Sequence, residues 1–338
     1  MHTMRLLDLI AQGRSARVLA ADGQELPGAG QFGEVIRACP VRYVFSDELS
    51  RCATQLAYAE GDRLSSCLDL IHVPARCLWV EWPDAPRREA LQAIPTLEVH
   101  SGAASRHCGA LITAAANCRS GQVRTFWSAP DEWAYLSPVI TSFDFDRPPA
   151  AAASADAAAA AGSWRGETVL RMDGEPALED LLVHLRFHLD DEWAAYYRAR
   201  CRTEQVRAAL LRRCLGACAF DGPMLMAFFL LLGARDLLPR QEIRHERINR
   251  VRCRAGKPPL LEHIEVSAPL DRPPTRAAAS VEASVRMSPR LHHVRGHIVR
   301  RGPAVFWRSP HLRGSARLGQ VRSRTVVLTF DSRAAVVS

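Results

Sequence analysis

Short strands are predicted where apolar and polar side chains alternate in the first part of the chain. Residues 78–82 alternate and are followed by a proline, which commonly ends a strand. Residues 123–127 repeat this pattern, with another proline soon after. Further strands are expected at 97–99 and 110–112, and short helices at 5–21 and 86–93. These elements favour an α+β fold, with a mixed α/β domain over residues 1–147 instead of a regular βαβ array.

The next stretch, residues 148–162, consists mainly of alanine and proline and has no large apolar side chain. Such a segment has nothing to bury in a core, so we predict a linker. Residues 269–280, rich in proline, alanine and arginine, are predicted to form a second loosely structured stretch.

A helical period dominates the segment after the linker, and we expect a helical region over residues 163–238. Leucines and aromatic residues keep helical spacing from Leu178 to Tyr196, which predicts one continuous helix. A later segment, residues 224–232, is apolar on every side and lies between a proline and a glycine. A helix that is apolar all round is typically buried.

Residues 239–338 combine arginines with strand patterns and predict a small basic module. An arginine-rich helix is expected over residues 241–255, followed by Gly256 as its stop signal. Strands are expected at 261–266, 291–300, 304–308 and 321–330, with a tight turn at 301–303. The module is therefore expected to be a basic helix followed by a β-rich part.

Charge is distributed unevenly along the chain, whose net charge is +8. Residues 239–338 hold 20 basic and 7 acidic side chains, a net +13, and the rest of the chain is at −5. Such an asymmetry is typical of a module that binds a polyanion. Lys257 is the only lysine, so the basic side chains are almost all arginines. A GC-rich genome explains this as well as a selected preference for guanidinium groups.

The ten cysteines are dispersed over the chain, and no secretory signal is apparent at its start. Reduced thiols in a cytosol are therefore favoured over disulfides. The longest apolar run has nine residues, whereas spanning a bilayer takes about 20. We expect a cytoplasmic protein, in a bacterial host, with no membrane partner.

Candidate nucleic-acid-binding residues lie in the basic helix and in the strands that follow it. Guanidinium groups hold phosphates through paired hydrogen bonds, and an aromatic ring stacks on a base. In and after the helix these residues are Arg244, Arg247, Arg250, Arg254 and Lys257. In the strands they are Arg295, Arg300, Trp307, Arg322 and Arg324. A solvated surface helix and a solvated strand face are the competing interpretations.

A catalytic alternative rests on the histidines of the segment 291–300. On one continuous strand His293, Arg295 and His297 share a face, because side chains alternate along a strand. Two imidazoles near neutral pH can divide the proton transfers of RNA cleavage, with arginines for the phosphate charge and Thr325 as a hydrogen-bond donor. This pattern is the basis for a metal-independent ribonuclease or toxin-like enzyme.

No metal or cofactor is expected. His184, His188 and Asp191 share a face of the predicted helix, but a charged helix face explains this spacing more simply. The cysteine spacings match no standard zinc site. The glycines form neither a phosphate-binding loop nor a dinucleotide fingerprint.

The C-terminal part also carries a recognisable pattern. It includes Gly256–Leu260, an Arg-Gly-His motif at 295–297 and a Phe-Trp-Arg strand end at 306–308 followed by Pro310. Over roughly residues 245–330 this pattern resembles the C-terminal signature of a loose family of phage and prophage proteins. The resemblance implies a mobile-element context and no particular reaction.

Three functions follow from these patterns. The leading one is an accessory protein of a phage or mobile element that binds DNA or RNA through its arginine-rich C-terminal module. The second is the ribonuclease that uses His293 and His297. The third is an interaction factor whose basic end contacts an acidic protein partner.

Overall fold

The structure is a computed structural model of the 338-residue chain. It describes residues 4–19, 23, 25–92, 105–147, 180–201, 221–234 and 238–268, and a few positions between 203 and 214. It also describes the backbone of 290–294, 297–301, 304–308, 311–313 and 315–320. The chain divides into two compact units, Met1–Asp271 with Gly302–Ala304, and Arg272–Arg301 with Val305–Ser338.

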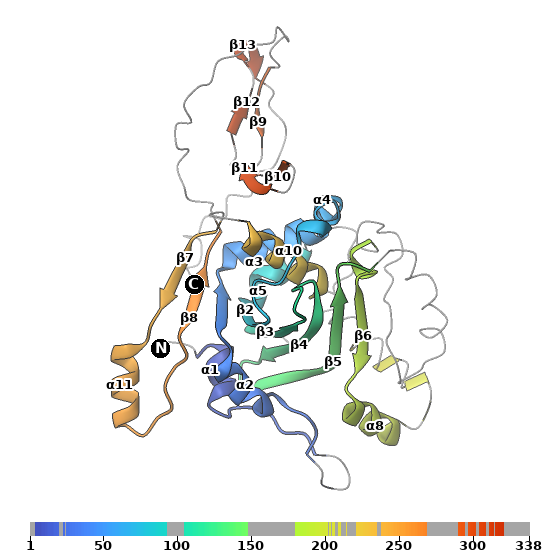
Figure 1. Ribbon diagram of the computed structural model, residues 1–338, viewed down its shortest axis with the longest axis vertical. Coiled ribbons are helices and arrows are strands. Elements are labelled where there is room, and N and C mark those ends of the chain that lie inside the picture. Colours follow the sequence, from blue (N-terminus) through green and yellow to red (C-terminus); the bar gives the residue numbers. More distant parts are fainter. Residues whose placement is uncertain are drawn as a thin grey trace, which may run out of the picture. The chain divides into compact units, whose positions relative to one another are not determined.

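The first unit is built on an eight-stranded mixed sheet with the strand order β6-β5-β4-β3-β2-β1-β8-β7 (Figure 1). Strand β1 lies parallel to both β2 and β8, and the remaining neighbours are antiparallel. The strands are β1 (Val41–Phe45), β2 (Cys77–Pro83), β3 (His107–Ala114), β4 (Ser120–Ser128), β5 (Ala134–Asp144), β6 (Leu185–Leu189), β7 (Arg240–Ile243) and β8 (His263–Val266).

Helices cover both faces of this sheet (Figure 1). One face is covered by α3 (Asp47–Tyr58), α5 (Asp84–Gln92) and α10 (Gly222–Gly233), and the other by α1 (Leu6–Ala11), η1 (Ala29–Phe32) and α2 (Gly33–Ala38). On the first face Phe228 of α10 packs on Phe45, with ring centroids 4.1 Å apart. On the second face Leu6 and Leu7 join a buried cluster with Trp79 and Phe126. The sheet therefore has a core on each side. The other helices that the structure describes are α4 (Gly61–Ser65), η2 (Leu68–Leu70), α8 (Asp191–Arg200) and α11 (Glu246–Arg254).

The α+β class is confirmed, as are several of its predicted elements. Strands β2 and β4 contain the alternating segments 78–82 and 123–127. Helix α10 contains the apolar segment 224–232, every residue of which is buried. It is also too short for a bilayer, and no described helix combines the length and apolarity needed to cross one.

The continuous helix predicted from Leu178 to Tyr196 is wrong. Residues 185–189 form β6, which pairs with β5 at the edge of the sheet, and α8 begins only at Asp191. Leu185, Phe187 and Leu189 are buried and also alternate, so the same leucines fit a strand period. The backbone groups of β5 need a partner, and this tertiary pairing overrides the helical spacing.

The basic helix is shorter than predicted, because its first residues form a strand. Residues 240–243 form β7, which pairs with β8, and α11 begins at Glu246. Strand β8 confirms the strand expected at 261–266 and lies beside β1. The expected domain boundaries at 147 and 239 thus fall within one sheet. Strands β1 to β5 precede the first boundary, β6 lies between the two, and β7 and β8 follow the second.

The second unit contains five described strands. They are β9 (Arg290–Val294), β10 (His297–Arg301), β11 (Ala304–Arg308), β12 (His311–Arg313) and β13 (Ser315–Gln320). The single strand predicted at 291–300 is wrong, because it is two strands, with β9 between β12 and β13 and β10 paired with β11. The sequence has a glycine between β9 and β10, a residue that often interrupts strands. The expected strands at 97–99 and 321–330 and the stretches 148–162 and 269–280 lie outside the described residues.

Candidate nucleic-acid interface

Helix α11 is presented at the edge of the sheet by the strands on either side of it. The chain leaves the sheet along β7, forms α11, and returns through residues 257–262 to β8, the antiparallel partner of β7. Gly256, which follows the C-cap residue Ala255, has φ +66°, a conformation that glycine adopts without strain. Figure 1 shows α11 at the outer edge of the unit, beside the pair β7–β8.

The returning segment holds α11 in place through side chains on the inner side of the helix. Asn249 donates a hydrogen bond to the Leu260 carbonyl at 2.9 Å and accepts one from the Leu260 amide at 2.7 Å. Arg252 donates to the carbonyl of Pro258 at 2.8 Å and to Gln12 at 3.1 Å. The helix is thereby fixed, although none of its residues is buried.

The outer side of α11 carries the predicted cations. Arg247, Arg250 and Arg254 are exposed and follow one another at helical spacings of three and four, so they share a face. Within the described part of the chain, neither these three arginines nor the exposed Lys257 has an ion-pair partner. Arg244, which precedes the helix, is exposed and paired with Glu242 at 2.9 Å. The helix therefore presents positive charge that no described carboxylate neutralises.

Apolar side chains lie among these cations. Ile248 is 49% exposed and Val251 is 63% exposed, both large values for branched apolar residues. A solvated helix gains nothing from such positions, whereas a helix that contacts a partner buries them. The exposed surface of α11 is therefore amphipathic.

Among the residues of the first unit that the structure describes, most other arginines have carboxylate partners. Arg119 contacts Asp146 at 2.6 Å, and Arg124 contacts Asp190 at 3.0 Å. Others with such partners are Arg5, Arg14, Arg17, Arg37, Arg51, Arg63, Arg87, Arg88, Arg106 and Arg147. Arg76 and Arg200 are also exposed without a described carboxylate partner, so α11 is distinguished by having three such cations on one helix face.

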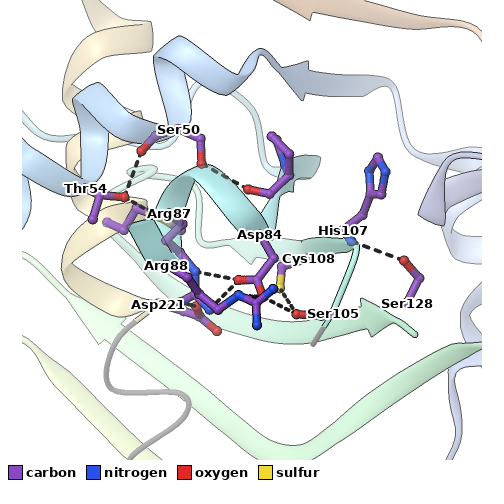
Figure 2. A network of polar contacts seen from close by, with 12 residues as sticks. Ser50, Thr54, Asp84, Arg87, Arg88, Ser105, His107, Cys108, Ser128 and Asp221 are labelled. Atoms are coloured by element: carbon purple, nitrogen blue, oxygen red, sulfur yellow. Dashed lines mark hydrogen bonds and ion pairs between the residues drawn. The ribbon is translucent and has the colours of Figure 1, made fainter. Parts of the chain in front are cut away.

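A buried polar network beneath α5 and the start of α10 was not predicted from the sequence (Figure 2). Arg87 bridges two carboxylates, Asp84 at 2.8 Å and Asp221 at 2.7 Å. Asp84 also forms an ion pair with Arg88 at 3.1 Å and accepts a hydrogen bond from the hydroxyl of Ser105. Burial raises the pKa of Asp221 to about 6. Because the carboxylate oxygens of Asp84 are occupied by protein donors, the network is suited to joining α5 to the start of α10, not to binding a substrate.

Cys108 of β3 lies beside this network, and burial raises the pKa of its thiol well above the ordinary value. A nucleophilic cysteine needs the opposite shift, because the thiolate is the reactive form. Cys108 is therefore a buried structural thiol.

A second unpredicted group is Glu81, a fully buried carboxylate in the middle of the apolar strand β2. It accepts hydrogen bonds from the amides of Leu6 and Leu7 at 2.8 and 3.0 Å, and it lies 3.4 Å from the imidazole of His107. Burial acts to raise the pKa of Glu81, but His107 and the two amides outweigh it and lower the pKa. The carboxylate anchors the first turn of α1. The sequence feature that could have indicated this buried carboxylate is an acidic residue between Trp79 and Trp82 in a predicted strand.

The predicted residues of the second unit are only partly described. His293 lies in β9 and His297 in β10, strands of two different sheets. The catalytic hypothesis itself stays a prediction. Trp307 lies in β11, and Arg300, in β10, is exposed. Arg295, Arg322, Arg324 and Thr325 lie outside the described residues.

The histidines once considered for a metal are also separated. His184 precedes β6, His188 lies within it, and Asp191 begins α8. Across the described ranges, no three histidine, cysteine, aspartate or glutamate side chains are arranged to hold a metal ion.

Comparison with the models of known protein families, with curated proteins and with solved structures found no match in any of the three. The candidate interface is therefore defined by its own geometry and charge.

Proposed function

We propose that the protein binds nucleic acid and that the outer face of α11 is part of the binding surface. The observation that carries the proposal is the set of exposed, unpaired cations at Arg247, Arg250, Arg254 and Lys257. Guanidinium forks bind phosphate oxygens through two parallel hydrogen bonds, and neutralising phosphates supplies most of non-specific affinity.

The form of α11 suits a groove of duplex DNA. The major groove is about 12 Å wide and accepts one α-helix. A helix held at the sheet edge by residues on its inner side leaves the outer side free to enter. Ile248 and Val251 then have an apolar counterpart in the methyl groups of thymine. The arginines at either side of them reach the phosphates.

We propose the arginine-rich residues 272–338 as a second, separate contributor to nucleic-acid binding. They hold 13 arginines and only two acidic side chains, a net +11. This part includes Arg295, Arg300, Trp307, Arg322 and Arg324, which stay predicted contacts. The association with a phage or mobile element rests on the sequence resemblance alone and also stays a prediction.

The test is the salt dependence of binding to a 20-base-pair duplex and to RNA of the same sequence, measured by fluorescence anisotropy between 50 and 200 mM salt. The triple variant Arg247→Ala, Arg250→Ala, Arg254→Ala removes three cations from α11. We expect it to bind at least about tenfold more weakly and to reduce the slope of log K against log salt by about 3, since each phosphate contact contributes roughly 0.9.

A matched control removes the same charge elsewhere. Arg51, Arg63 and Arg76 are outside the proposed surface, and their triple alanine variant should bind nearly as the wild type does. Equal losses in both triple variants would show that only net charge matters and would refute a role for α11. Failure of the wild type to bind either nucleic acid at 50 mM salt would favour an acidic protein as the partner.

A further inference from the structure

Two cysteines meet where α2 ends and β2 begins. Cys39 follows α2 directly, and Cys77 is the first residue of β2. The parallel register of β1 and β2 places Val41 beside Leu78, so the residues just before them also come together. The two Sγ atoms are 3.5 Å apart.

The position of Cys39 is fixed by its surroundings. The guanidinium of Arg42 donates to the carbonyls of Ile36 at 3.2 Å, of Arg37 at 3.3 Å and of Cys39 itself. The Cys39 thiol donates to the carbonyl of Val41 at 3.2 Å. Cys39 is only 2% exposed, whereas Cys77 is half-buried. Cys77 is therefore the more exposed residue of the pair, and Cys39 the more buried one.

We propose that Cys39 and Cys77 form an oxidation site that closes to an intramolecular disulfide in the presence of a low-molecular-weight disulfide such as oxidised glutathione. A disulfide holds its sulfur atoms about 2.05 Å apart, so closure needs an approach of roughly 1.5 Å. The bond joins the end of α2 to the start of β2.

The reaction proceeds in two exchanges. The Cys77 thiolate attacks one sulfur of oxidised glutathione, which forms a mixed disulfide and releases one glutathione thiolate. The Cys39 thiol then loses its proton to solvent, and its thiolate attacks the Cys77 sulfur and releases the second glutathione. Two protein thiols are oxidised, and one glutathione disulfide is reduced to two glutathione thiols.

The second exchange should be the slow one. Burial, with a smaller contribution from the free Cys77 thiol, raises the pKa of Cys39 to about 12 in the reduced protein, and burial still raises this pKa once Cys77 is in the mixed disulfide. Only a small fraction of Cys39 is then thiolate at neutral pH. As long as the pH stays below the pKa, this fraction rises about tenfold for each unit by which the pH is increased. The rate of closure is therefore expected to rise about tenfold from pH 7 to pH 8.

The experiment is peptide mapping of the folded full-length protein after incubation with excess oxidised glutathione, with alkylation of free thiols and no reduction. Trypsin cleaves after Arg37, Arg42, Arg76 and Arg87. The two cysteines thus fall in separate peptides, 38–42 and 77–87, with one cysteine in each. We expect mass spectrometry to find these two peptides joined, and reduction to separate them.

Three variants test each step. Cys77→Ala should abolish the joined peptide and leave Cys39 unmodified, because the buried thiol has no access to glutathione. Cys39→Ala should trap the mixed disulfide on Cys77. Cys52→Ala, which removes another half-buried thiol, should still give the joined peptide. Circular dichroism shows whether each variant is folded.

Two results in the wild type would overturn the proposal. One is the recovery of both peptides as alkylated thiols from folded protein. The other is accumulation of the glutathione adduct on Cys77 without closure at any pH between 7 and 9. Neither result bears on nucleic-acid binding by α11, so the two proposals can fail separately.

Discussion

Gly109 lies opposite Glu81 on the strand beside it, and the indole of Trp79 covers it. A Cβ atom at this position would lie 2.6 Å from Cζ2 of Trp79 and 3.2 Å from a methyl group of Leu6. We therefore expect Gly109→Ala to lower the free energy of unfolding by about 1–3 kcal/mol, as overpacked cores do. Urea denaturation measures this loss. In a Trp79→Phe background the same substitution should cost less, and an unchanged cost would show that Trp79 is not the cause.

Asp8 is a second residue whose environment sets a measurable property. Its buried carboxylate accepts a bond from the Leu261 amide at 2.8 Å, and burial is the main cause that raises its pKa to about 6, with a smaller contribution from Glu81. Arg5 and Arg252 oppose this shift. Since the folded pKa exceeds the unfolded value, the stability from this group is complete below about pH 4 and is lost as the pH rises through 6.

Asp8→Asn keeps an oxygen for the Leu261 amide and removes the titration. We expect the variant to be more stable than the wild type at pH 7, by on the order of 2 kcal/mol, since two pKa units correspond to nearly 3 kcal/mol at most. This advantage should disappear near pH 4. Denaturation curves at both pH values give the comparison, and a difference that does not change with pH would contradict the assignment.

At the scale of elements, the sequence correctly predicted the helices and strands whose hydrophobic pattern fits either a helical or a strand period, but not both. Helix α10 is apolar on all sides and too long for a strand, and β2 is a short, largely apolar segment that ends at Pro83. The leucines of 178–196 fit both a helical and a strand period. Residues 185–189 form a strand because they pair with the edge of β5. The cations of α11 were predictable from spacing, but their lack of ion-pair partners was not, because carboxylates such as Glu242 lie equally near in sequence.

The attachment of α11 can be tested without changing its charge. Asn249→Ala removes both hydrogen bonds to Leu260, which we expect to destabilise the local structure by about 1–3 kcal/mol. Amide hydrogen exchange in residues 246–262 should become faster, while β2 and β3 stay protected. Nucleic-acid binding should weaken as well. The matched variant Arg250→Ala should weaken binding with unchanged exchange, and equal exchange in both variants would disprove the role of Asn249.

At the scale of the whole molecule, the positive charge and the described fold belong largely to different parts of the chain. Residues 1–271 hold 31 basic and 34 acidic side chains, a net −3, against +11 for the remainder. The first unit nevertheless includes β7, α11 and β8. Composition alone placed a basic module at 239–338, because sequence averages cannot show that β8 pairs with β1. Removal of everything after residue 238 would take away β7 and β8, leave one edge of β1 without a partner strand and damage the sheet.

Truncation after Asp271 separates the two sources of charge and leaves the sheet whole. The fragment 1–271 should unfold in one cooperative transition, because its described core and sheet are complete without the second unit. It should still bind duplex DNA, but more weakly than the full chain. Four cations on and beside α11 limit the slope of log K against log salt to about −4, since each phosphate contributes roughly 0.9. The full chain, with 13 further arginines, should give a steeper slope.

Alanine at positions 247, 250 and 254 in the fragment should then abolish the remaining binding. A fragment that folds and does not bind would remove α11 from the interface, and a fragment that binds with the full slope would remove residues 272–338.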